Sequence, residues 1–123
     1  MADLLALESG AQILLCETEG PALSSEQDAL NLIGESFGHE IAVVAIPAQR
    51  LDSRFFSLSS GIAGAFTQKF VTYQIKLAII GDISSHLEQS SALRAYVHET
   101  NRGNQVWFLD DLTALNTQLS PGL

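Results

Sequence analysis

The residues of this sequence that could do chemistry are short polar groups, and most of them directly follow apolar runs such as IAVVAIP and KLAIIG. Arginine side chains and the free N–H groups at a helix start favour anions, and neighbouring carboxylates favour hard cations. In an open α/β sheet such groups gather beyond the carboxyl ends of the strands, where ligands bind. The residues that meet this description are Arg50, Arg54, Ser59, Ser60, Gly61, Asp82, Ser84, Ser85, Asp110 and Asp111.

Two interpretations of these residues stay open. Ser60, Ser85 and Asp111 are typical N-caps, each worth about 1 kcal/mol, and capping is the interpretation that we prefer. The alternative is a pocket at the strand ends that binds a small molecule or an anion. A metal site that joins Asp82 with Asp110 or Asp111 is a further alternative, although we expect no metal or other cofactor. The binding residues that we select are Arg54, Ser59, Ser60, Gly61, Asp82 and Ser84.

The familiar catalytic patterns do not occur in the sequence. Cys16 lies within ILLCE, where a small buried thiol is the usual occupant. His39, His86 and His98 lack the spacing of metal ligands. Neither the GxSxG turn of hydrolases nor a GxGxxG or GxxxxGK[ST] phosphate-binding loop is found. The sequence therefore supports no enzyme class.

The charge distribution argues against several kinds of partner. Asp and Glu number 14 against 6 Lys and Arg, for a net charge of −8, and no Lys or Arg precedes Arg50. Nucleic acids and anionic membranes need clustered basic residues, and no apolar run reaches the ~18 residues of a membrane span. The first residues lack the basic and apolar regions of a signal peptide. With 123 residues, 46% of them hydrophobic, we expect one domain over 1–123, located in the cytoplasm.

Strand and helix patterns alternate along the chain. Two short apolar runs around Glu8-Ser9-Gly10 predict an antiparallel hairpin. IAVVAIP, KLAIIGD and QVWFLDD are continuous apolar runs, as in strands covered on both faces. Helical spacing is found in SSEQDALNLIGESFG, in GIAGAFTQKFVTYQ, from Ser84 or Ser85 to Arg102, and in LTALNTQL.

This alternation predicts an α/β fold in which a mixed, mostly parallel sheet of about five strands carries about four helices. We expect IAVVAI, KLAII and QVWFL at the centre of the sheet, with Val43, Val44, Ile79 and Phe108 almost fully buried.

Serines should open two of the helices. Ser24 or Ser25 can cap the first helix, and Gln27 or Asp28, three residues further on, can close a capping box with it. Ser85 and Glu88 can form the box of the helix that ends at Arg102.

Several segments carry a resemblance to a known family. The elements FF-x-L-x-[ST]-G-x-AG, QKF, GDIS and NRG-x-x-VWF are similar to the uncharacterised bacterial domain-of-unknown-function family numbered 4180, over nearly the whole chain. That resemblance implies a fold and no activity.

More distantly, the order of elements and the S-S-G opening of the second helix resemble STAS domains of the anti-sigma-factor antagonist type. In those domains the serine next to the glycine of D-S-S-G is phosphorylated to control binding of a protein partner. The resemblance implies that Ser60, in Ser59-Ser60-Gly61, is the phosphoacceptor. Leu58 stands where that pattern has aspartate, so a kinase would meet an apolar side chain there.

We therefore expect a STAS-like module of a bacterial cytoplasm that acts through protein–protein contacts. The alternative is a small-molecule or anion-binding protein, or a weak enzyme, that uses the pocket at the strand ends. Phe55 and Phe56 lie side by side in a loop, so we expect one ring in the core and the other exposed or at an interface, for instance that of a homodimer.

Overall fold

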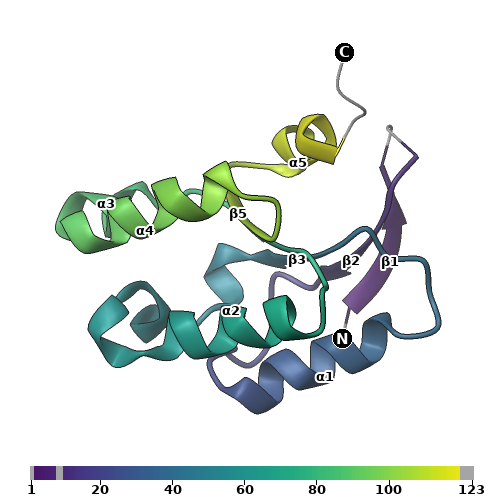
Figure 1. Cartoon of the computed structure of the whole chain (residues 1–123), viewed down its shortest axis with the longest axis horizontal. Coiled ribbons are helices and arrows are strands. Elements are labelled where there is room, and N and C mark those ends of the chain that lie inside the picture. Colours follow the sequence, from purple (N-terminus) through teal and green to yellow (C-terminus); the bar gives the residue numbers. More distant parts are fainter. Residues whose placement is uncertain (1, 8–9, 120–123) are drawn as a thin grey trace.

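A mixed sheet of five strands forms the middle of the computed structural model, which describes residues 2–7 and 10–119 (Figure 1). β1 runs antiparallel to β2, and the remaining neighbouring pairs are parallel. This arrangement confirms the predicted α/β architecture with an antiparallel N-terminal edge. Glu8 and Ser9 of the predicted hairpin turn lie outside the described residues. In their order across the sheet, which is also their order in the chain, the strands are β1 (Ala2–Ala6), β2 (Gln12–Cys16), β3 (Val43–Pro47), β4 (Leu77–Ile80) and β5 (Val106–Leu109).

Helices cover both faces of this sheet, but unequally. Because neighbouring parallel strands follow one another along the chain, right-handed crossovers bring α1, α2 and α4 to the same face. α5 covers the opposite face, and Figure 1 shows it above the sheet with α1 and α2 below. Within the described residues, no helix is both long enough and apolar enough to span a membrane. The helices are α1 (Glu26–Ser36), α2 (Ile62–Thr72), α3 (Ser84–Gln89), α4 (Ser91–Arg102) and α5 (Leu112–Leu119).

Each face of the sheet has its own apolar cluster. On the face covered by α1, α2 and α4, the side chains of Phe66 and Phe70 from α2 are fully buried with Ile79 from β4. On the opposite face, Leu115 of α5 packs in a cluster with Trp107 of β5 and with side chains of β2, β3 and β4. Both faces are covered, so all five residues of β3 are buried and its apolar run shows no alternation.

The predicted core residues are confirmed, whereas the predicted strand order is wrong in part. Val43, Val44, Ile79 and Phe108 are at most 7% exposed. β3 and β4 do lie inside the sheet, but β5 is an edge strand. Its continuous apolar run reflects cover on both faces rather than a central position, because α4 packs on one side of it and α5 on the other.

The helix predicted from Ser84 or Ser85 to Arg102 is broken into α3 and α4. Ser90 causes the break: its backbone is extended, and its hydroxyl oxygen accepts a hydrogen bond from the N–H of Leu93 at 3.0 Å, which makes it the N-cap of α4. The predicted capping box of Ser85 and Glu88 is wrong, because the first turn of α3 receives no bond from Ser85. At α1, by contrast, the predicted box is present between Ser25 and Asp28.

Candidate functional site

The connection from β3 to α2 builds one wall of the candidate site. It lies at the carboxyl end of the parallel strands and consists of three short 3-10 turns, η1 (Ala48–Arg50), η2 (Ser53–Phe56) and η3 (Leu58–Ser60). Phe55 anchors this connection, because its side chain is fully buried and meets the ring of Phe66 edge-to-face at 5.8 Å between centroids. This aromatic side chain therefore anchors the loop in the core.

Phe55 is the ring that was predicted in the core, whereas the prediction that the other ring is exposed is wrong. Phe56 is also buried, with only 6% of its surface exposed. A 3-10 turn spreads successive side chains about 120° apart, and here Phe55 turns toward Phe66 while Phe56 turns toward α3. The expected interface through these rings consequently has no exposed aromatic surface to use.

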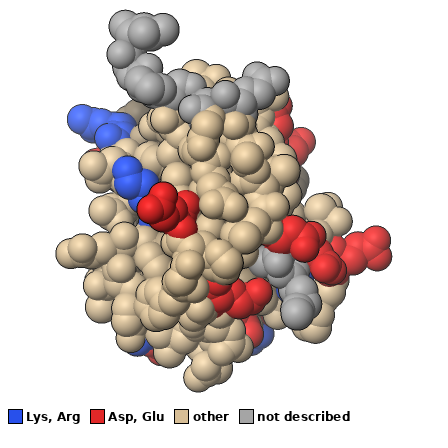
Figure 2. Space-filling view, turned by 90° about the vertical axis from the view of Figure 1, so that its right-hand side faces the viewer, with Lys and Arg blue, Asp and Glu red and all other residues tan. Residues whose placement is uncertain are grey.

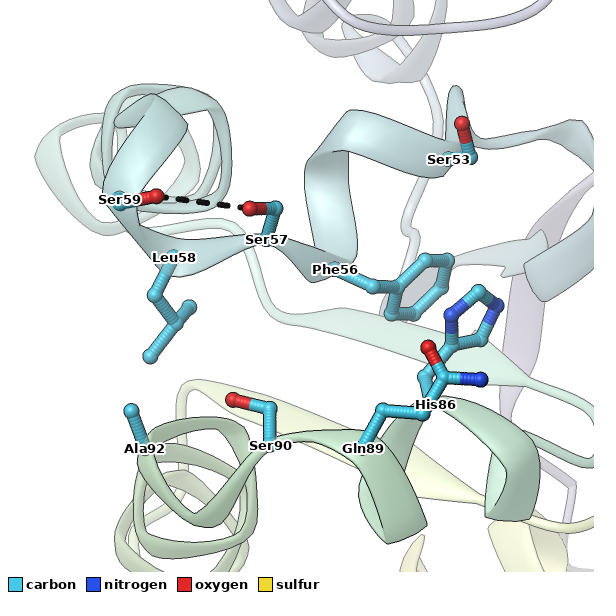
Figure 3. A pocket seen from close by; sticks show the side chains of 9 residues that line it. All are labelled: Ser53, Phe56, Ser57, Leu58, Ser59, His86, Gln89, Ser90 and Ala92. Atoms are coloured by element: carbon cyan, nitrogen blue, oxygen red, sulfur yellow. Dashed lines mark hydrogen bonds between the residues drawn. The ribbon is translucent and has the colours of Figure 1, made fainter.

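A pocket of about 510 Å³ lies between this connection and the α3–α4 segment (Figure 3). The imidazole of His86 stacks on the ring of Phe56, with 4.2 Å between centroids and 12° between the planes. Figure 3 shows the loop residues on one side and the residues of α3 and α4 on the other. The residues that line the pocket are Ser53, Phe56, Ser57, Leu58, Ser59, His86, Gln89, Ser90 and Ala92.

The lining of this pocket is polar but carries no fixed charge. Four of its nine residues are serines and one is a glutamine, so hydroxyl and amide groups can both donate and accept there. Leu58, Ala92 and the Phe56 ring supply the apolar part of the lining. His86 supplies the one imidazole of the lining, and no carboxylate or thiol accompanies it there. Such a site suits recognition of a neutral polar group.

Ser59 and Ser60, although adjacent, have different roles in the structure. Ser59 lines the pocket, and its hydroxyl lies 3.5 Å from that of Ser57. The Ser60 hydroxyl donates a hydrogen bond to the carbonyl of Arg54 at 2.8 Å and accepts one from the N–H of Ile62 at 3.2 Å. The N-cap of α2 is Gly61 and not Ser60 as predicted, but the second bond still satisfies a free N–H at the start of α2.

Gly61 and Arg54, the other predicted binding residues of this loop, also have structural roles. Gly61 adopts a left-handed backbone with φ of +80°, which ends η3 and starts α2, and only glycine adopts this conformation without strain. The Arg54 guanidinium, 67% exposed, forms an ion pair with Asp52 at 3.0 Å, and this pairing lowers the pKa of the Asp52 carboxyl. Neither residue belongs to the pocket lining.

The predicted residues after β4 and β5 make local hydrogen bonds at the starts of α3 and α5. Asp82 accepts a hydrogen bond from the N–H of Ser84 at 2.9 Å, and this backbone bond is the main cause of the lowered pKa of Asp82. Asp111 accepts one from the N–H of Ala114 at 2.8 Å and so caps α5. Within residues 2–7 and 10–119, no three His, Cys, Asp or Glu side chains come together as a metal site would require.

Arg50 is buried and holds a neighbouring loop. Only 7% of its surface is exposed, and its guanidinium donates to the carbonyls of Glu17 at 2.8 Å and Pro21 at 3.2 Å. Gly20 allows this approach, because a Cβ atom there would lie 3.0 Å from the guanidinium carbon. Arg50 therefore stabilises the segment that follows β2 and does not face the pocket.

A comparison with known proteins shows to which family this chain belongs. The family model described as "Domain of unknown function (DUF4180)" matches residues 8–119. The chain belongs to the DUF4180 family. No curated protein and no solved structure matches it.

Several pocket residues of this DUF4180 domain could not be identified from sequence patterns. Near the break between α3 and α4 lie His86, Gln89 and Ser90. The spacing of apolar residues predicts one continuous helix in this region. The signal available was the doublet Ser90-Ser91, since serine in the middle of a helical pattern favours a cap. Of the six predicted binding residues, the pocket contains Ser59.

Proposed function

We propose that this DUF4180 domain is a binding module, and that the pocket between residues 53–59 and the α3–α4 segment receives a neutral polar ligand or ligand group. The observation that carries the proposal is the convergence of serine, glutamine and imidazole groups, without any charged side chain, on one pocket of about 510 Å³. That volume falls within the range of pockets for small ligands.

The chemistry of the lining argues for this class of ligand over an anion. A bound anion would lose hydration without gaining a cation in return, because the nearest predicted arginine, Arg54, is paired with Asp52 and lies outside the lining. A hydroxyl or amide group, by contrast, would exchange hydrogen bonds with water for bonds of similar strength to the serines and Gln89. A flat ligand group could also pack against the half-buried imidazole of His86, which is itself stacked on the Phe56 ring.

A screen by protein NMR tests this proposal. We expect neutral hydroxyl- and amide-rich compounds to shift the amide signals of Ser57, Ser59 and Gln89. Ser59→Trp, which places a large side chain in the pocket, should abolish the shifts, and Ser84→Trp is the matched control because Ser84 is exposed and outside the lining. Binding that survives Ser59→Trp, or a preference for multiply charged anions, would contradict the proposal.

A second candidate is control of a protein partner, in the manner of STAS domains, in a bacterial cytoplasm. It is favoured by the exposed Ser59 and Ser60 directly before α2, beside the pocket. A phosphate on Ser60 would lie at a helix start, where its charge is favoured, but it would remove the hydrogen bond to the Arg54 carbonyl. Phosphorylation would thus loosen one pocket wall.

Intact-mass measurement of the protein from its own cell tests this candidate. A stoichiometric phosphate on Ser60 would support it, and unmodified protein under all growth conditions would argue for the ligand-binding function alone.

A further inference from the structure

The two edges of the sheet differ in how their backbone groups are used. At the β5 edge, the side chain of Asn101 accepts a hydrogen bond from the N–H of Phe108 at 2.7 Å and donates one to its carbonyl at 3.1 Å. One side-chain amide therefore occupies both backbone groups of Phe108, in the way that a further strand would. Such cover hinders pairing with another chain at this position of the edge.

The β1 edge has no such cover. The N–H of Leu7 bonds to the carbonyl of Ala11 at 2.8 Å, and the N–H of Ala42 bonds to the carbonyl of Gln12 at 2.7 Å. In an antiparallel pair, the N–H and C=O groups of every second residue point toward the neighbouring strand. Since Leu7 bonds to Ala11, the N–H and C=O groups of Leu5 and Asp3 also point toward β2. The backbone groups of alternate residues then point away from the sheet, and these residues are Ala2, Leu4 and Ala6. Within the described residues, none of these outward groups has a hydrogen-bond partner.

The side chains of β1 add an apolar contribution. Leu4 is 43% exposed and Leu5 is 37% exposed, on opposite faces of the strand. β1 contains no lysine, arginine or proline, which are the usual residues that keep edge strands apart. Figure 2, which views the molecule from the β1 side, shows uncharged surface between separate charged groups, most of them acidic. This edge can accept a strand that is itself largely apolar.

We propose that β1 is a homodimer interface, at which two copies of this chain pair antiparallel and join their sheets into one. In the proposed register Leu4 lies opposite Leu4 of the partner subunit, and Ala2 lies opposite Ala6 of the partner subunit. All three outward-facing residues of each strand then form backbone hydrogen bonds. Leu4 meets its copy on one face, and Leu5 approaches its copy diagonally on the other.

Repulsion between like charges and the number of paired residues favour this register over the other twofold-symmetric registers of β1. A twofold axis at Asp3 would place two carboxylates directly opposite each other, which is destabilising. An axis at Leu5 would leave Ala2 unpaired. With the axis at Leu4, Asp3 lies opposite Leu5 of the partner subunit, so the two Asp3 carboxylates are diagonal neighbours and no longer lie directly opposite each other. The strand is thus complementary to its own copy, which is why a second copy is the occupant that we infer.

Analytical ultracentrifugation of the full chain without an N-terminal tag tests the proposal. We expect a concentration-dependent monomer–dimer equilibrium in the wild-type protein. Leu4→Lys should raise the dimer dissociation constant at least tenfold, because it places like charges at the twofold axis. Val71→Lys is the matched control, since Val71 is also an exposed aliphatic residue, on α2, and should leave the equilibrium unchanged.

A mixing experiment tests the axis itself. Leu4→Lys and Leu4→Glu should each be monomeric, whereas an equimolar mixture should form a heterodimer through opposite charges at the axis. Circular dichroism of each variant establishes that it is folded. A wild-type protein that stays monomeric at several hundred micromolar, a dimer that Leu4→Lys does not weaken, or a mixture that does not associate would overturn the proposal.

Discussion

Replacing Ser60 with alanine removes two hydrogen bonds that hold the connection before α2. The hydroxyl donates to the carbonyl of Arg54 and accepts from the N–H of Ile62, at 2.8 Å and 3.2 Å. A typical internal hydrogen bond contributes a net of about 0.5–1.5 kcal/mol. Since Ser60 is exposed, water can replace part of what is lost. We therefore expect Ser60→Ala to lower the free energy of unfolding by about 1.5 kcal/mol, more than the ~1 kcal/mol of a simple cap.

Ser60→Asp should not rescue this loss, contrary to what the capping pattern alone suggests. A carboxylate can accept from the Ile62 N–H and is favoured at the start of a helix. It cannot donate to the Arg54 carbonyl, however, and it brings a negative oxygen against that carbonyl. We expect a net loss of about 1 kcal/mol, where an isolated N-cap would lose nothing.

Urea unfolding followed by circular dichroism measures both variants. Ser59→Ala is the matched control, because the Ser59 hydroxyl contacts that of Ser57 at 3.5 Å and, among the described residues, bonds to no backbone group. Its effect should stay below about 0.5 kcal/mol, as is usual for surface substitutions. The reasoning is refuted if Ser60→Ala and Ser59→Ala have equal effects, or if Ser60→Asp is more stable than the wild type.

Three further predictions concern the core and the buried polar groups. Ile79→Asp should yield no soluble folded protein in an expression and solubility assay, because an unpaired charge in this 1%-exposed position costs several kcal/mol. Arg50→Gln should lower stability in thermal unfolding by about 3 kcal/mol, because the buried guanidinium no longer donates to the carbonyls of Glu17 and Pro21, whereas replacing the exposed Arg54 with Gln should change it little. Burial raises the pKa of Cys16 from 9.0 to about 11, so maleimide should label it at pH 8 only after unfolding. The stability that comes from keeping this thiol protonated should be complete below pH 9 and should decline between pH 9 and about 11, as unfolding titrations at several pH values would show.

Apolar periodicity was sufficient to predict the sheet and most helices, because burial on one or both faces determines which positions along the sequence are apolar. The run around Val44 and the spacing of Phe66 and Phe70 are examples, and all three side chains are fully buried. The strand order is harder to predict from the sequence, since an edge strand covered on both faces, such as β5, has the same apolar composition as a central strand.

The candidate site was harder to predict, because it depends on how one loop folds back on a distant segment. The stacking of His86 on Phe56 joins residues that are far apart in sequence, and no local pattern encodes their contact. Predicted binding residues such as Asp82 proved to be engaged in local hydrogen bonds, since serine and aspartate after a strand satisfy helix starts more often than they bind ligands.

The unequal cover of the two sheet faces has a consequence for synthesis on the ribosome. The face that packs against α1, α2 and α4 can close progressively, as each crossover helix is made before the next strand. The face around Trp107 depends on α5, which is made last among the described elements, and its central residue Leu115 is fully buried only once α5 docks. At ~5–20 residues per second, the apolar side of a nearly complete sheet stays open for on the order of a second. That interval is when a nascent chain of this protein would be most exposed to chaperones and to aggregation.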